Sequence, residues 1–525
     1  MQQIPSVPAL PSSVPQLVAP PSMTPAQATQ QLPAFVAQRL NVTGVHAYRE
    51  SELVAVAGFE PGRPVTLQTL YDMADRITQR YRQDGFLVAR AYLPAQEIKD
   101  GVVTIAVLEG QYGQVRVDNS SSLASDVPRG LLAGLNPGDV IVTEPLEERL
   151  LLLSDLPGVQ VRSTLAPGAS VGLSDLIVEV KPGPRLSGSV DVDNAGNRYT
   201  GTNRIGATLN LNNPAGRGDL ATLRALTSGS GLQYLRGAYQ IPVGRGRVGL
   251  AYSDLEYELG REFKALDASG HARIASLFGS YPLIRSRHTN LNLGLTLEGK
   301  EFSDRIDAIP AVTDKRAQVA IATLYGDQRD QVGAGGLSSY SLALSSGNLD
   351  IRTPAARTLD AATAGSDGHY NKLAFALSRL QQTSPSWSFL ASLSGQVAAQ
   401  NLDVSEKMEL GGMYGVRAYP EGEAYADEGY LLTLEARKQL SLPPTMLGQV
   451  HLAAFIDAGA VTLNQSPWTA GSNRRHLSGA GVGAYWTRPN DFAVKAFYAR
   501  KLGSEDALSA PDKSGRFWIQ AVKYF

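Results

Sequence analysis

From residue 185 to residue 525 the sequence repeats one pattern, a short segment in which apolar residues occupy every second position. In one such segment Leu291, Leu293, Leu295 and Leu297 alternate with small or polar residues. A period of two places the apolar side chains on one face of a β-strand and the remaining side chains on the other. Membrane β-barrels and soluble β-sandwiches share this alternation, so one segment alone does not distinguish them.

The number of segments favours a barrel. We count sixteen, an even number, as expected for antiparallel strands that close on themselves and leave no unpaired edge. All four tryptophans and 16 of the 21 tyrosines lie in this part of the chain, which suits aromatic girdles at the membrane surfaces. The expected strands are 185–195, 203–212, 218–228, 231–242, 247–259, 271–284, 287–302, 315–327, 335–348, 368–381, 386–399, 427–441, 449–462, 474–488, 491–503 and 515–525.

Composition excludes several other classes of protein. No apolar run approaches the ~18–20 residues that a membrane-spanning helix needs. The 48 Lys and Arg against 49 Asp and Glu leave a net charge of −1, which provides no basic field for nucleic acid. With no cysteine, no metal-type spacing among the six histidines and no Ser-His-Asp arrangement, we expect no enzyme, no cofactor and no metal site. The glycine run at 479–483 resembles a phosphate loop, but it lies in an alternating segment without a following helix.

Residues 1–33 differ from the rest of the chain. They contain eight of the 30 prolines and no charged residue, and the first charge is Arg39. Such a segment cannot bury a core, so we expect an extended, proline-rich linker. Only Pro25–Leu32 could form a short plug helix, and Pro33 would end it. No signal peptide is visible, which we interpret as a leader already removed.

Residues 34–183 predict two small α+β units, 34–110 and 111–183. In the first, Leu67, Leu70, Ala74, Ile77 and Tyr81 fall on one face of a helix. Strands are expected on both sides of the helices, in the order β-α-α-β-β, and the same order recurs in the second unit. The alternative is a pair of unrelated α+β domains. The fold class is therefore mixed, with two small α+β units before a 16-stranded antiparallel transmembrane barrel over 184–525.

A long interval, residues 400–427, interrupts the regular spacing of the strands, and long loops of this kind are often functional. It contains the sequence Val416-Arg417-Ala418-Tyr419. In the strand that follows at 449–462, Asp457 must face the lumen if Ile456 faces lipid, because a charge in lipid costs several kcal/mol. Arg417 could then pair with Asp457, or it could be a solvated loop charge. Glu435 and Arg437 are also expected to face the lumen, as ordinary wall charges.

Three further motifs complete the pattern. The sequence Asn213-Pro214-Ala215-Gly216-Arg217-Gly218-Asp219 predicts a turn, and Phe455-Ile456-Asp457-Ala458-Gly459 lies in an expected strand. The chain ends on Phe525 within an amphipathic segment. Lys523 shares a face with Phe525, and we expect its amine to reach the membrane interface.

In order and spacing these motifs resemble the two-partner secretion transporters (TpsB, haemolysin-activator type), which are relatives of the BamA-type insertases. In that family the motif is Val-Arg-Gly-Phe/Tyr, matched here by Val416, Arg417 and Tyr419, with Ala418 in place of glycine. The resemblance implies that the two small units are periplasmic POTRA domains and that the 400–427 loop folds into the barrel.

The same resemblance implies that Arg417 and Asp457 lock this loop, with Phe455 and Gly459 on the same strand. Asn213, Pro214, Gly216, Gly218 and Asp219 would form a barrel turn, and Phe525 would be the signal for assembly.

The function implied is export of one large secreted partner protein across the outer membrane of a Gram-negative cell, without nucleotide. Outer-membrane lipid, the barrel-assembly machinery and a monomeric state are further expectations. A BamA-like insertase would carry more amino-terminal units than two. A passive porin would carry neither the units nor the inner loop.

Overall fold

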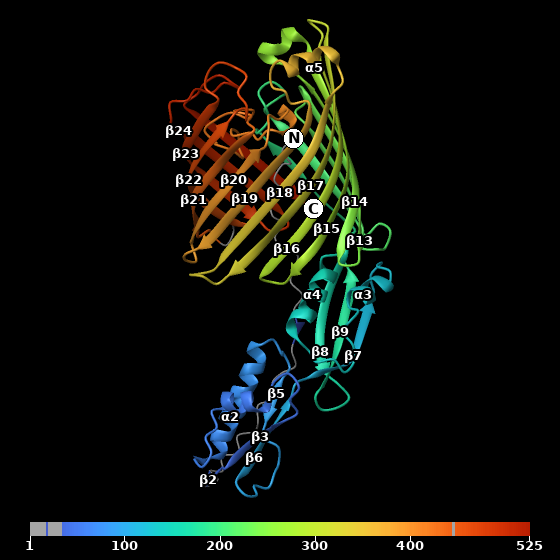
Figure 1. The fold of residues 1–525 in the computed structure, drawn as a ribbon, viewed down its shortest axis with the longest axis vertical. Coiled ribbons are helices and arrows are strands. Elements are labelled where there is room, and N and C mark those ends of the chain that lie inside the picture. The colour runs from blue at the N-terminus through green and yellow to red at the C-terminus, as the bar shows by residue number, and fades with distance from the viewer. Residues whose placement is uncertain (1–16, 19–33, 444–446) are drawn as a thin grey trace. The chain divides into compact units, whose positions relative to one another are not determined.

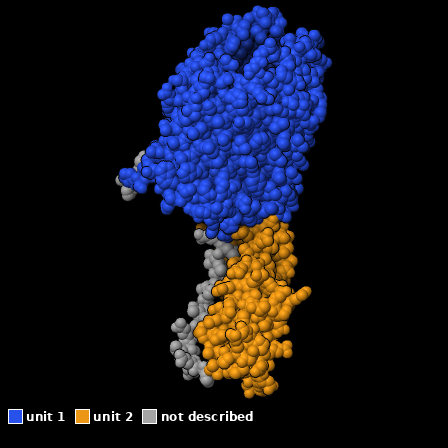
Figure 2. Space-filling model, turned by 60° about the vertical axis from the view of Figure 1, so that its left-hand side comes forward, with its two compact units in different colours: residues 1–11, 184–525 blue, residues 12–183 orange. Residues whose placement is uncertain are grey.

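The computed structural model describes residues 17–18, 34–443 and 447–525. It divides into two compact units, the first of which ends at Gly183 while the second begins at Pro184 (Figure 2). The predicted linker and plug segment lie outside the described residues, apart from β1 (Leu17–Val18). These two residues pair in parallel with Ser163 and Thr164 of β8.

The first small domain folds around the predicted helical face (Figure 1). Leu70, Ile77 and Tyr81 of the longest helix are fully buried, whereas Leu67 at its start is only half-buried. Thr66 caps this helix by accepting a hydrogen bond from the Thr69 backbone N–H, and Gly85, with a φ of 91°, follows its end. The elements are β2 (Phe35–Val36), β3 (Arg39–Thr43), α1 (Glu50–Ala57), β4 (Pro64–Val65), α2 (Leu67–Gln83), β5 (Arg90–Tyr92) and β6 (Val102–Leu108), with the sheet order β3-β6-β5.

Glu109 is a polar anchor in this first core. Its carboxylate accepts hydrogen bonds from the backbone N–H groups of His46 (2.7 Å) and Ala47 (2.8 Å) and from the Tyr81 hydroxyl (2.8 Å). Burial opposes ionisation, but these donors outweigh it and hold the pKa of Glu109 below its usual value. The ionised carboxylate therefore joins α2 to the chain that follows β3.

The second small domain has the predicted order β-α-α-β-β, whereas in the first domain the short strand β4 lies between the two helices. Its two helices pack on a sheet whose order is β1-β8-β9-β7, and its core includes Leu146, Leu153 and Leu176. The elements are β7 (Gln111–Asn119), α3 (Asp126–Leu131), α4 (Thr143–Ser154), β8 (Val159–Pro167) and β9 (Leu173–Pro182).

The remaining strands form a closed antiparallel barrel of sixteen, β10 to β25, which confirms the predicted fold (Figure 1). Each strand pairs with its neighbours in sequence, and β10 pairs with β25 to close the ring. The strands are β10 (Leu186–Asp193), β11 (Arg204–Asn212), β12 (Leu220–Thr227), β13 (Leu232–Val243), β14 (Gly246–Glu258), β15 (Ala268–Arg285), β16 (Thr289–Ile306), β17 (Ala311–Asp330), β18 (Gly336–Ile351), β19 (Gly368–Gln382), β20 (Trp387–Ala398), β21 (Glu428–Leu440), β22 (Gln449–Thr462), β23 (Arg474–Arg488), β24 (Phe492–Lys501) and β25 (Gly515–Tyr524).

Exposure alternates along the strands as the sequence predicts. On β16 the leucines at 293, 295 and 297 are exposed, whereas the residues between them are less so. Of the tryptophans, Trp387, Trp468 and Trp486 are exposed, but Trp518 is buried, so the expectation of a girdle position for every tryptophan is wrong. Its neighbours Phe517 and Ile519 take the outer face, which turns Trp518 into the lumen.

The carboxyl terminus takes part in closing the ring. Phe525 and Gly188 exchange backbone hydrogen bonds of 3.1 Å and 2.9 Å. Lys523 is on the exposed face with Phe525 and forms an ion pair with Asp491, in the turn between β23 and β24.

The connections add short helices that the sequence pattern does not predict. These are η1 (Arg261–Leu266), α5 (Pro354–Ala361) and η2 (Val404–Glu406), the last of which lies within the long 400–427 loop. Among the described residues, no helix combines the length and the apolar character needed to cross a membrane.

Candidate functional site

The 400–427 segment, which we name the lumen loop, is held by contacts to the inner faces of strands on both sides of the barrel. At its centre, Arg417 is 5 % exposed and Asp457 of β22 is fully buried. The guanidinium forms a two-pronged pair with this carboxylate, Nε to Oδ2 at 2.8 Å and Nη2 to Oδ1 at 2.9 Å. The backbone N–H of Arg417 also donates to Oδ2 at 3.1 Å, and the Thr433 hydroxyl donates to Oδ1 at 3.0 Å.

Glu435 belongs to the same site, so its interpretation as an ordinary wall charge is wrong. Arg417 Nη1 donates to Glu435 Oε2 at 3.0 Å. The other oxygen of Glu435 accepts from Arg437 Nε and from the Tyr485 hydroxyl, each at 2.7 Å. Glu435 faces Phe455 across the β21–β22 pair, so strand register brings it beside Asp457. The two carboxylates balance Arg417 and Arg437, which makes the buried cluster neutral.

Aromatic rings support the guanidinium from the inner wall. The Arg417 Cζ atom lies 3.3 Å from the centre of the Phe455 ring and 4.9 Å from that of Phe497 on β24. Phe497 in turn packs edge-to-face against Phe455 and Tyr485. Trp518 Nε1 donates to the Arg417 carbonyl at 2.7 Å, so β25 also contacts the loop.

Glycines on β22 and β23 provide the space for this arrangement. A Cβ on Gly479 would lie 2.5 Å from the Ala418 Cβ, and a Cβ on Gly481 would lie 2.5 Å from the Phe455 ring. A Cβ on Gly459 would approach Leu410 of the lumen loop to 2.4 Å. Gly479 therefore makes room for the lumen loop, and Gly481 makes room for the Phe455 ring on which Arg417 rests.

The remaining motif residues of the loop are also buried. Val416 and Tyr419 are fully buried, and the Tyr419 hydroxyl donates to the Glu505 carbonyl at 3.0 Å. Ala418, which stands where the family motif has glycine, is not among the described residues with positive φ, so its Cβ introduces no strain.

A second anchor, which the sequence analysis missed, holds the beginning of the lumen loop to the opposite wall. Glu406 is buried and forms ion pairs with Lys300 of β16 (2.7 Å) and Lys372 of β19 (2.9 Å). Asp403 pairs with Lys315 of β17 at 2.9 Å. Lysines that project inward from a barrel wall are a weak sequence signal, because their partners are distant in the chain.

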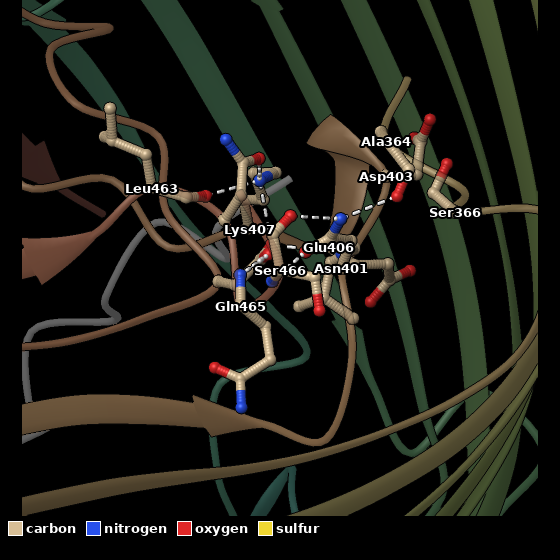
Figure 3. Close-up of polar contacts among 12 residues, drawn as sticks. Ala364, Ser366, Asn401, Asp403, Glu406, Lys407, Leu463, Gln465 and Ser466 are labelled. Carbon is tan, nitrogen blue, oxygen red and sulfur yellow. Dashed lines mark hydrogen bonds and ion pairs between the residues drawn. The ribbon is translucent and has the colours of Figure 1, made fainter. Parts of the chain in front are cut away.

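A third set of contacts joins both ends of the loop to neighbouring connections (Figure 3). Lys407 pairs with the fully buried Asp427 at 2.8 Å and donates to the Leu463 carbonyl at 2.6 Å. Asn401 exchanges hydrogen bonds with the backbone of Ser466, 2.7 Å and 2.9 Å long. The loop is therefore fixed at its centre and at both ends.

The predicted turn over 213–219 forms between β11 and β12. Asp219 is fully buried and accepts hydrogen bonds from the backbone N–H groups of Ala215 and Arg217 and from the Tyr239 hydroxyl. Asn213 accepts from the Gly218 N–H at 2.7 Å. Gly216 and Gly218 have φ values of 75° and 76°, a region that favours glycine. Pro214 lies within this turn, away from the lumen loop.

Comparison with known proteins shows the family of this chain. Residues 172–486 match the family described as haemolysin secretion/activation protein ShlB/FhaC/HecB, and residues 35–110 match the POTRA domain of ShlB type. The chain belongs to this family. It is 30 % identical over 472 residues to the heme/hemopexin transporter protein HuxB of Haemophilus influenzae, covering 88 % of this chain and 82 % of HuxB.

Two further proteins extend the comparison. The outer membrane transporter CdiB of Dickeya dadantii is 22 % identical, covering 87 % of this chain and 82 % of CdiB. The structure of CdiB from Escherichia coli superimposes with a TM-score of 0.74 at 21 % identity, covering 96 % of this chain and 93 % of that one. The chain is an outer-membrane transporter of the two-partner type with periplasmic POTRA domains, and members of its family are transporters.

Proposed function

We propose that this transporter binds one large secreted partner in the periplasm while the partner is unfolded, and passes it through the barrel as an extended chain. The observation that supports the proposal best is the lumen loop, which is fixed at three places across the interior of the barrel. A passive pore does not need a loop that is fixed inside its lumen. A transporter needs a loop whose working position is defined during export.

Arg417 and Asp457 have the central role in this proposal. Their pair, with Glu435, holds the loop against β21 to β25, while Glu406 holds it against β16 and β19. An extended chain then passes beside a loop of fixed shape and folds outside the cell. We assign no nucleotide to this step.

Strand addition provides the recognition step. The outer edge of β8 already accepts a short parallel strand, because Leu17–Val18 pairs with Ser163 and Thr164. Among the described residues, only Ser163 and Thr164 of the nine-residue β8 have a partner on this edge, and we propose that a longer strand of the partner protein can pair along it. An unfolded partner can supply backbone donors and acceptors there, with little demand on its sequence.

The proposal also assigns roles to the domains and to the carboxyl terminus. We take residues 34–110 and 111–183 as the two recognition domains and 184–525 as a monomeric pore in outer-membrane lipid. Phe525 is the assembly signal read by the barrel-assembly machinery. The heme, hemopexin or toxin systems of the relatives do not identify the partner of this chain.

Site-specific photo-crosslinking in living cells tests the recognition step. A photoreactive residue at Gln160 or Arg162, both exposed on β8, should crosslink to a co-expressed secreted partner encoded beside the transporter gene. The matched control is Val171, which is 85 % exposed in the loop between β8 and β9. Equal crosslinking at all three positions would contradict strand addition on β8, and export of the partner without this transporter would contradict the function itself.

A further inference from the structure

The outer face of the barrel carries a row of alternating charges across five strands. Strand register places Asp254, Arg273, Glu301, Arg316 and Asp350 side by side, one each on β14 to β18. We name this set the charged row. Each of the five is an even number of positions away from exposed apolar residues on its own strand, such as Leu250, Leu277 and Leu297. All five side chains therefore point to the outer face.

The charged row lies toward the extracellular end of the wall. The chain enters the barrel from the periplasmic domains at Leu186, so this end of β10 is periplasmic. Antiparallel pairing then places the turn between β13 and β14 at the periplasmic end. Asp254 lies near the other, extracellular end of β14.

A polar cavity of about 950 Å³ opens at the charged row. Its lining includes Arg273 and Arg316 of the charged row, His271 one row outward, and Arg305 two rows outward. Arg305 is exposed, and no ion pair among the described residues involves it. The pair between Arg316 Nη2 and Glu301 Oε1 is 3.0 Å long but about half exposed on both sides, so a stronger anion can replace the carboxylate at little cost.

The acidic side of the cavity does not form a metal site. Asp254, Glu256 and His271 have ligand-type atoms within 4.8 Å of one another. Arg273 Nε, however, lies 3.0 Å from His271 Nε2 and 3.4 Å from Asp254 Oδ2. A guanidinium therefore already supplies the positive charge in this group.

An apolar hollow of about 1230 Å³ lies on the same strands, one row closer to the periplasm. Tyr239, Leu250 and Leu277 line it, and the small residues Ala275, Gly299 and Ala320 make the wall recede. Ala275 and Gly299 pair across β15 and β16, directly next to Arg273 and Glu301. The polar cavity and the hollow are therefore neighbours along the strand direction.

We propose that this wall binds a phosphorylated lipid of the outer leaflet, with its headgroup in the polar cavity and an acyl chain in the hollow. Guanidinium groups pair with phosphate in a two-pronged geometry, and Arg305 and Arg316 present two of them. In the hollow, the acyl chain packs against apolar side chains of the barrel wall instead of against neighbouring lipids. The order of the two sites matches the order of headgroup and chain in the leaflet.

Native mass spectrometry of the full chain, extracted from outer membranes in a mild detergent, tests the proposal. The unmodified protein should carry one phosphorylated glycolipid. The variant Arg305→Ala/Arg316→Ala should bind added diphosphorylated lipid A about tenfold more weakly. Arg500→Ala is the matched control, because Arg500 is exposed on the outer face at the extracellular end of β24.

A second pair of variants tests the hollow independently. Ala320→Trp should fill it and lower the amount of bound lipid A, whereas Ala496→Trp on the outer face of β24 should not. The heat-modifiable electrophoretic band confirms that each variant is a folded barrel. Equal lipid binding by test and control variants, or equal affinity for phosphatidylethanolamine or inorganic phosphate, would overturn the proposal.

Discussion

At the residue scale, the site depends on the buried guanidinium of Arg417. Several neighbouring groups share in balancing its charge and accepting its hydrogen bonds. Arg417 uses three side-chain nitrogens on Asp457 and Glu435 and rests on the Phe455 ring. Removing one partner from such a cluster leaves an unpaired charge in a buried site. That loss costs far more than an exposed ion pair contributes.

The first prediction concerns this pair. Arg417→Ala and Asp457→Ala should each destabilise the fixed position of the lumen loop by roughly 3–5 kcal/mol and strongly reduce export. The barrel should remain folded, since its strands pair independently of the loop. Export is measured as partner protein in the medium, with heat-modifiability as the control for folding. Undiminished export by both variants would remove the proposed role.

The second prediction concerns Glu109 in the first POTRA domain. Glu109→Gln removes the ionised acceptor for two backbone N–H groups and should cost about 1–3 kcal/mol of domain stability at neutral pH. Because the pKa of Glu109 is lowered in the folded domain, its contribution is complete above the pKa of the unfolded chain, about 4.3, and is lost as the pH falls through the lower folded value.

Hydrogen exchange of α2 amides in the full chain measures this effect. The difference between the unmodified chain and Glu109→Gln should shrink as the pH is lowered below about 4. A difference that is constant with pH would show that Glu109 acts only through packing.

At the element scale, the glycines of β23 leave space for the segments that pack against the inner face of this strand. Its glycines at 479, 481 and 483 face the lumen loop and the aromatic rings beneath it, and each leaves no room for a side chain. The strand itself was predictable from the period-two pattern. The reason for its glycines was not, because the atoms they avoid belong to Ala418, Phe455 and Phe497, on three other segments.

The third prediction follows from this shape. Gly481→Val places a branched side chain against the Tyr498 carbonyl and the Phe455 ring, so the ring must move away from Arg417 and export should fall. Gly237→Ala is the control, because a Cβ there meets no atom within 4 Å. Export and barrel folding are compared for both variants. Normal export by Gly481→Val would show that the ring support is dispensable.

At the scale of the whole molecule, closure joins the ends of the barrel domain. Gly188 on the first strand exchanges two backbone hydrogen bonds with Phe525, the last residue of the chain. A missing bond at this seam leaves backbone groups unpaired next to lipid, where each costs several kcal/mol.

The fourth prediction tests the seam. Deletion of Phe525 should lower the amount of heat-modifiable barrel in the outer membrane, whereas Phe525→Tyr should preserve it, because the backbone bonds and the aromatic ring remain. Quantitative immunoblotting of membrane fractions measures both. Equal amounts of barrel in the deletion variant and the unmodified protein would contradict a role for Phe525 in assembly.

Sequence by itself determined the architecture: the sixteen strands, their inward and outward faces, the β-α-α-β-β order of the second small domain, and the inward direction of Asp457. These depend on local periodicity and on the cost of a charge in lipid, which every short segment expresses alone. Tertiary structure decided the partners, namely Glu435 beside Arg417, the lysines around Glu406, and Trp518 in the lumen. The physical reason is that cross-strand register and loop folding bring together residues that are far apart in the chain, from 18 positions for Arg417 and Glu435 to 106 for Lys300 and Glu406, and no local pattern encodes those distances.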